Sequence, residues 1–326
     1  MNKDMGYTNE ALAVAAKNLA KETRKSVVVL FTGYRKEAKA LNKEIDETEA
    51  NIIVEELKKI ESPQKEGIIL INTLGGYVHA TERIIEALIG KLDKNLRPNG
   101  GKFKKLIVVI AGRALSSGTT LACAGDEIWM RDVSVLGPTD VQIGGCSVHD
   151  IIYWEHVAAF DNDVMLRRLD DPRSATAKMW RDKKKREAFR KQFSGNRDYH
   201  EARLKQKMEF SHDADLFLTA LLARKKVDKA NELSWEVAHS IVAKHLSNPK
   251  IYSHFEKFSG AQAHDIGLKV FNIEDWPYGG LEHLRVLHNA SMEELQKKPV
   301  KDGVIESSVI HVEPYFEKKG SMDKSY

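Results

Sequence analysis

The sequence predicts an α/β protein in which helices cover a mostly parallel β-sheet, and two observations support this class. Residues 26–33 (SVVVLFTG), 67–73 (GIILINT) and 105–111 (KLIVVIA) have the continuous apolar character of strands buried on both faces. Segments with apolar residues at helical spacing lie between them, at 46–62 and 78–92. Because strands and helices alternate, right-handed crossovers should place these strands side by side and parallel.

The remaining elements extend this core at both ends. An amphipathic helix is expected within residues 1–25, and a helix of small residues beginning at Ser116 leads to a short strand at 126–130. Near the C-terminus, residues 259–273 predict a helix, a turn and a strand, and residues 307–313 (SSVIHVE) predict an edge strand.

The middle of the chain differs from the core in composition. We expect a core at 1–147, a charged and mostly helical insertion at 148–247, and a return to the core at 248–326. The segment 174–210 is strongly charged and contains the basic run at 183–186. Because acidic residues are interleaved around this run, it indicates a solvated helix face and not a nucleic-acid site.

Composition narrows the functional classes. Of 326 residues, 42% are apolar and 30% charged, which is ordinary for a soluble protein, and 51 basic against 47 acidic residues leave a net charge of +4. This near-balance does not favour nucleic acid as a partner. The two cysteines, Cys123 and Cys146, cannot form a disulfide framework and lack metal-site spacing. With no signal-peptide pattern and no apolar run of about 20 residues, we expect a cytoplasmic protein without a membrane partner.

Two glycine-containing turns follow two of the predicted strands. Gly75-Gly76 follows 67–73, and Ser116-Ser117 lies in the turn after 105–111. In α/β sheets, ligands bind beyond the carboxyl ends of the strands, and glycines allow backbone N–H groups to point outward there. A serine in such a turn could act as a nucleophile. It could equally be a helix N-cap, and Gly75-Gly76 an ordinary strand–helix turn.

The order of these turns resembles a known family. ILINTLGGYVHATERIIEAL resembles the Gly-Gly segment of the Clp-type serine peptidases, and GRALSSGTTLA resembles their nucleophile segment, G-x-A-x-S-x-G. With AGDEIWMRDVSVLGPTD, the chain is most similar to the serine dehydrogenase proteinase family. The resemblance covers residues 26–145 and, more weakly, 248–272. It implies a crotonase-like fold built from repeated β-β-α units.

The resemblance also implies a catalytic apparatus. Ser116 would be the nucleophile, His254 the base and Asp140 the acid that orients it, while the backbone amides of Gly76 and Ser117 would form the oxyanion hole. Clp peptidases carry their histidine where this sequence has Asp140, so the order Ser, Asp, His follows the serine dehydrogenase proteinase branch. The implied protein is a cytoplasmic serine endopeptidase, a homo-oligomer without metal or cofactor, and its need for a partner ATPase is open.

Other residues compete for these roles. His79 follows Gly76 and could approach the site, whereas His149 and His156 are interpreted as structural histidines. Asp126 and Glu127 are expected to cap or pair at the entrance of a strand. Asp140 could also simply end a Gly-Pro turn, and His254 could be a surface histidine.

Three alternatives stay open at this point, the first of catalytic mechanism and the other two of function. The first is a Ser–Lys dyad using Lys178 or Lys183, although no motif marks either residue. The second is a crotonase-like acyl-CoA enzyme, which would use the same two amides without a nucleophilic serine. The third is an inactive scaffold on the same fold.

Overall fold

A computed structural model describes residues 10–32, 44–60, 64–143, 146–148, 197–224, 233–247, 257–296 and 308–315. The chain forms two compact units. The first comprises Met1–Gly137, Leu221–Leu233 and Lys257–Tyr326, and the second comprises Pro138–Ala220 and Ser234–Glu256.

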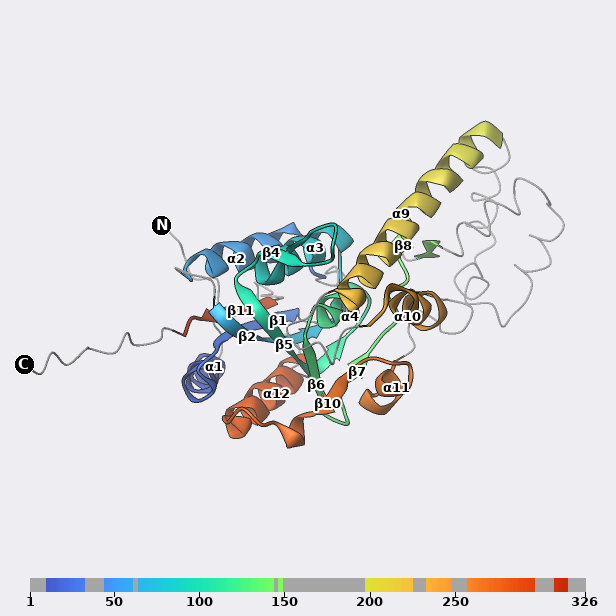
Figure 1. Cartoon of the computed structure of the whole chain (residues 1–326). Coiled ribbons are helices and arrows are strands. Elements are labelled where there is room, and N and C mark those ends of the chain that lie inside the picture. The colour runs from blue at the N-terminus through green and yellow to red at the C-terminus, as the bar shows by residue number, and fades with distance from the viewer. Residues whose placement is uncertain are drawn as a thin grey trace, which may run out of the picture. The chain divides into compact units, whose positions relative to one another are not determined.

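The first unit is built on a seven-stranded sheet (Figure 1). Its strand order is β10-β6-β5-β2-β1-β11, and β7 also pairs with β5. The strands β1, β2, β5, β6, β7 and β10 run parallel to one another, and β11 pairs antiparallel with β1 at the edge of this sheet. The predicted mixed α/β class with a mostly parallel sheet is therefore confirmed. The strands are β1 (Ser26–Thr32), β2 (Gln64–Thr73), β5 (Phe103–Ala114), β6 (Glu127–Met130), β7 (Val135–Leu136), β10 (Val270–Asn272) and β11 (Ser308–Glu313).

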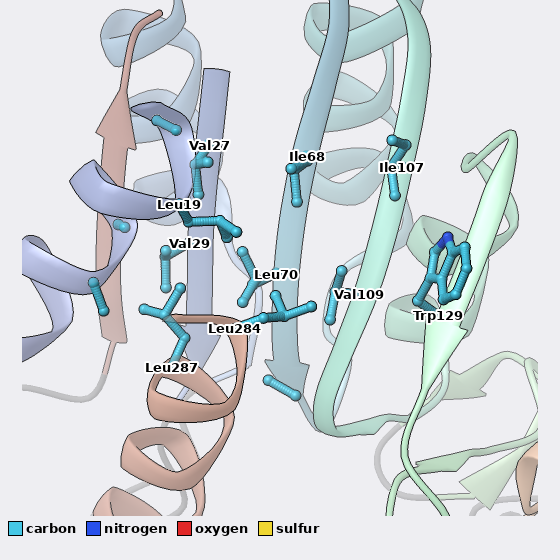
Figure 2. Close-up of a cluster of buried hydrophobic side chains, with 14 of the residues drawn as sticks. Leu19, Val27, Val29, Ile68, Leu70, Ile107, Val109, Trp129, Leu284 and Leu287 are labelled. Carbon is cyan, nitrogen blue, oxygen red and sulfur yellow. The ribbon is translucent and has the colours of Figure 1, made fainter. Parts of the chain in front are cut away.

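Helices cover both faces of this sheet, which explains the unbroken apolar runs of its strands. Helices α1 (Glu10–Thr23) and α12 (Leu281–Gln296) pack on one face, as Figure 2 shows for Leu19, Leu284 and Leu287. Helices α2 (Glu47–Lys58), α3 (Val78–Ile89) and α4 (Ser117–Cys123) lie on the other (Figure 1). In β2 the residues of both faces, Ile68 to Ile71, have 0% exposure.

In this unit, the observed ends of helices and strands can be compared with the ends predicted from the sequence. The helix expected at 78–92 ends at Ile89, because Gly90 takes φ 93° and starts a hairpin of β3 (Gly90–Leu92) and β4 (Pro98–Gly100). The edge strand expected at 307–313 is confirmed as β11, which covers the outer edge of β1. The helix and strand expected at 259–273 are confirmed as α11 (Gly260–Asp265) and β10, and the short 3₁₀ turn Ile273–Asp275 follows them.

The described part of the second unit is mainly helical. It contains most of α9 (Arg197–Ala223), then α10 (Trp235–Ile241) with a π-helical continuation at Val242–Leu246, and a small hairpin of β8 (Gln142–Ile143) and β9 (Cys146–Ser147). The described part of the segment expected at 148–247 is thus helical, whereas the basic run at 183–186 lies outside the described residues. None of the described helices is long and apolar enough to cross a membrane.

Candidate functional site

The sheet brings the two glycine-containing turns together. Strands β2 and β5 are parallel neighbours, and their register ends with Thr73 beside Ala114. The Leu115 N–H then donates to the Thr73 carbonyl oxygen at 3.2 Å. The turns that continue from these strands therefore lie against each other. A Cβ placed on Gly75 would stand 2.8 Å from the Ser116 Cβ and 3.0 Å from the Ser117 nitrogen.

Ser116 adopts a backbone conformation that L-residues rarely take. Its φ is 52° and its ψ is −125°, which lies outside even the left-handed helical region. Such a conformation costs about 1–3 kcal/mol and persists only where the surroundings impose it. Here the preceding strand and the following helix α4, both packed in the core, hold the residue between them.

The side chain of Ser116 does not act as a helix cap. Ser116 occupies the N-cap position of α4 but makes no side-chain capping bond. The N–H groups of Gly118 and Thr119, which a cap would accept, donate to the carbonyl oxygens of Leu115 and Ser116 at 2.8 Å. The half-buried Ser116 hydroxyl has no hydrogen-bond partner among the described residues. Ser116 therefore stands at the N-cap position, as the alternative interpretation expected, but its hydroxyl does not cap the helix.

Two backbone N–H groups beside Ser116 also have no hydrogen-bond acceptor among the described residues. The N–H of Gly75 donates to Thr73 Oγ1 at 3.0 Å, and the N–H of Tyr77 donates to the Ile45 carbonyl oxygen at 2.8 Å. Between them, the N–H of Gly76 finds no acceptor in the described part of the chain, and neither does that of Ser117. These are the two amides that the resemblance assigns to an oxyanion hole.

Buried threonines hold both turns in place. Thr32 Oγ1 donates to Thr73 Oγ1 at 2.6 Å, and Thr73 in turn accepts from the Gly75 N–H. Thr119 Oγ1 lies 2.7 Å from the carbonyl oxygens of both Ala114 and Gly137. None of these threonines is among the site residues predicted from the sequence. The sequence feature that could have identified Thr32 and Thr73 is their position at the end of an apolar strand. A hydroxyl buried there needs a hydrogen-bond partner.

Ser117 differs from Ser116 in its side chain. The Ser117 side chain is enclosed, with 5% exposure, and its Oγ has no hydrogen-bond partner in the described structure. Its backbone N–H, in contrast, begins helix α4 on the side of Gly75. Ser117 can therefore contribute an amide to this site, whereas its hydroxyl is less accessible than that of Ser116.

Of the two other members of the predicted triad, Asp140 is among the described residues and His254 is not. Asp140 belongs to the second unit and is 2% exposed. The neighbouring Thr139 N–H donates to the Leu246 carbonyl oxygen at 2.8 Å, which fixes the backbone there. His254 lies outside the described residues, and its role stays a prediction. The alternative residues His149, His156, Lys178 and Lys183 also lie outside them.

His79, Asp126 and Glu127 have partners of their own. The exposed His79 Nε2 lies 3.1 Å from Glu47 Oε1 at the start of α2. Asp126 forms a buried ion pair with Arg224 at 3.1 Å, and Glu127 pairs with Lys105 at 2.6 Å. The predicted pairing of Asp126 and Glu127 at a strand entrance is therefore confirmed.

A cavity of about 370 Å³ lies at the opposite end of α4, where Cys123, Asp126 and His264 are among the lining residues and Ser116 and Gly76 are not. Within the described ranges, no group of three or more His, Cys, Asp or Glu side chains is arranged to hold a metal ion.

Comparison of the chain with models of protein families gives no match, and comparison with curated proteins gives none either. The function is therefore inferred from the residues around Ser116.

Proposed function

We propose that this protein is a serine endopeptidase of the Clp class, with a crotonase-like core, that forms an acyl-enzyme at Ser116. The single observation that carries the proposal is the arrangement at Ser116. A strained serine with an unengaged hydroxyl lies beside two backbone N–H groups that have no acceptor among the described residues.

The chemistry follows from these groups. The Ser116 Oγ attacks the carbonyl carbon of the scissile peptide, and its proton passes to His254. The carbonyl oxygen becomes an oxyanion, which accepts hydrogen bonds from the Gly76 and Ser117 N–H groups. When the C–N bond breaks, the amine takes the proton from His254. Water then hydrolyses the ester with His254 again as base, and Asp140 orients the imidazole throughout.

The strain and the unengaged hydroxyl of Ser116 favour a peptidase over the two alternative functions, an acyl-CoA enzyme and an inactive scaffold. An acyl-CoA enzyme of the crotonase type would use the amide pair but has no need for an unengaged serine hydroxyl. An inactive scaffold would gain nothing from a strained residue, which reduces the free energy of unfolding. Cytoplasmic location, homo-oligomeric assembly and a peptide or protein substrate belong to the same proposal.

Labelling with a fluorophosphonate, followed by mass-spectrometric mapping of the modified residue, tests the proposal. We expect the probe on Ser116 and no labelling of Ser116→Ala. Ser117→Ala is the matched control, because it removes the adjacent hydroxyl and keeps the backbone N–H; it should still be labelled. Equal labelling of Ser116→Ala would overturn the proposal. Thioester turnover that survives Ser116→Ala would instead support an acyl-CoA enzyme.

A further inference from the structure

We infer that Ile45 is a positioning residue for the Gly76 amide: its backbone sets the direction in which this N–H points. The inference rests on the proposed function, because it assigns Ile45 to the oxyanion hole of that reaction.

Ile45 holds the Gly-Gly turn through both polar groups of its own backbone. The Ile45 N–H donates to the Gly75 carbonyl oxygen at 2.7 Å, and the Ile45 carbonyl oxygen accepts from the Tyr77 N–H at 2.8 Å. These two bonds form an isolated parallel bridge between Ile45 and Gly76. The residue itself is completely buried.

Because the peptide bond is planar, the first of these hydrogen bonds also fixes the direction of the Gly76 N–H. The Gly75 carbonyl and the Gly76 N–H belong to one planar trans peptide unit, so they point in opposite directions. Because Ile45 binds the carbonyl, the Gly76 N–H must point away from Ile45. The second bond fixes the next peptide unit, at Tyr77, and so prevents the turn from rotating about Gly76.

The contact is too close for any residue larger than glycine at position 76. A Cβ on Gly76 would come within 2.2 Å of the Ile45 carbonyl oxygen and 2.3 Å of its nitrogen. The glycine is therefore required by the approach of Ile45, in addition to its φ of 156°.

The start of helix α2 anchors Ile45 in turn. Asp46 is the N-cap of α2: its carboxylate accepts from the Thr48 N–H at 2.6 Å, and its own N–H donates to Glu49 Oε2 at 3.1 Å. The next residue, Glu47, contacts both His79 and Arg83 on α3. These last ion pairs are exposed and contribute little, so the capping box is the main anchor.

Tyr77→Pro, compared with Tyr77→Ala, tests the inference most directly. Tyr77 has φ −69°, which proline adopts without strain, so the proline variant removes the N–H that binds Ile45 and keeps the backbone conformation allowed. Both variants lose the exposed tyrosine ring. The proline variant also places its Cδ where the N–H pointed at the Ile45 carbonyl oxygen, so it separates the two segments as well as deleting the bond. The ratio of the two rates therefore measures the loss of the contact between Ile45 and the Gly-Gly turn.

The rates to compare are fluorophosphonate labelling of Ser116 and hydrolysis of a p-nitrophenyl ester. We expect Tyr77→Pro to react about ten- to a hundredfold more slowly than Tyr77→Ala in both reactions. This loss is smaller than the roughly 10²–10³-fold loss of rate on deleting an oxyanion donor, because the amide is misdirected and not removed. The loss should appear in kcat with KM unchanged, because a misdirected amide affects the transition state and not substrate binding.

A second pair of variants covers the case in which Tyr77→Pro does not fold, as judged by circular dichroism. Asp46→Ala removes the cap, and Asp46→Asn keeps it. We expect a several-fold slower reaction for Asp46→Ala and recovery of the rate in Asp46→Asn.

The outcomes separate this inference from the proposed function. If wild-type Ser116 is labelled and folded Tyr77→Pro reacts as fast as Tyr77→Ala, the inference is overturned and the proposed function stands. The same holds if Asp46→Ala loses stability without any change in rate, because Ile45 would then be merely structural. If wild-type Ser116 is not labelled, the proposed function fails and the inference fails with it.

Discussion

Gly75 lies so close to Ser116 that a Cβ on Gly75 would stand 2.8 Å from the Ser116 Cβ and 2.5 Å from the Leu115 carbonyl oxygen. The two turns of the site are thus packed backbone against backbone, with no side chain between them. This contact places the Gly76 turn beside Ser116, and it makes the geometry of the site sensitive to a single methyl group.

Gly75→Ala should therefore disrupt the site more than the same change at another glycine of similar conformation. Gly75 has φ 99° and no room for a Cβ, whereas Gly100 has φ 83° and a Cβ placed on it would meet nothing within 4 Å. Both substitutions should cost about 1–2 kcal/mol of backbone strain, and only Gly75→Ala should add a packing cost of about 1–3 kcal/mol. Urea unfolding of both variants measures the difference. Equal losses would show that the Gly75 contact is not tight.

Ser116→Gly should raise the free energy of unfolding relative to Ser116→Ala. Both remove the hydroxyl, but only glycine adopts φ 52° without strain, so the glycine variant should be more stable by about 1 kcal/mol. The matched control is Thr120, inside helix α4, where glycine should be less stable than alanine by about 1 kcal/mol. If the glycine variant were less stable than the alanine variant at both positions, strain at Ser116 would be contradicted.

Asp140 and His254 should act as one unit if the proposed triad is correct. We expect His254→Ala to slow ester hydrolysis by on the order of 10⁴-fold or more, and Asp140→Asn to slow it strongly as well, because the acid fixes the tautomer of the base. The double variant should be little slower than His254→Ala alone. Steady-state kinetics of the three variants measures this. Multiplicative losses would break the triad and favour a lysine base.

The buried His288 should make the protein less stable in mild acid. Burial, with a smaller contribution from the positive charge of Arg131, lowers the pKa of His288 from 6.5 to about 4. The unfolded chain therefore binds this proton near pH 6.5 while the folded chain does not. Stability should be fully present above pH 6.5 and fall by up to about 3 kcal/mol as the pH drops to 4.

Urea unfolding at several pH values between 7 and 4 checks this prediction. His288→Leu should flatten the pH dependence over this range, because it removes the buried group that must protonate. His264→Ala, at an exposed histidine of α11, is the matched control, because it removes a histidine without removing a buried group. An unchanged slope in His288→Leu would show that other groups cause the acid sensitivity.

The sequence by itself determined the class of the fold and the local character of the site. Unbroken apolar runs such as those of β2 and β5 are typical of strands covered on both faces, and the polar alternation near residue 310 belongs to an edge. The sequence also indicated where both turns of the site would lie, since glycine and serine after a buried strand are local features that need no knowledge of distant contacts.

Only the tertiary structure decided how these pieces meet. The register that sets Thr73 beside Ala114 brings Gly75 onto Ser116, and no local pattern specifies that register. Ile45 reaches the Gly-Gly turn from a segment without any motif, and Arg224 reaches Asp126 from the end of α9, far along the chain. Periodicity and turn residues are properties of neighbours in the chain. Pairing register, strain at Ser116 and the burial of His288 arise from contacts between distant segments, which become defined only when the core packs.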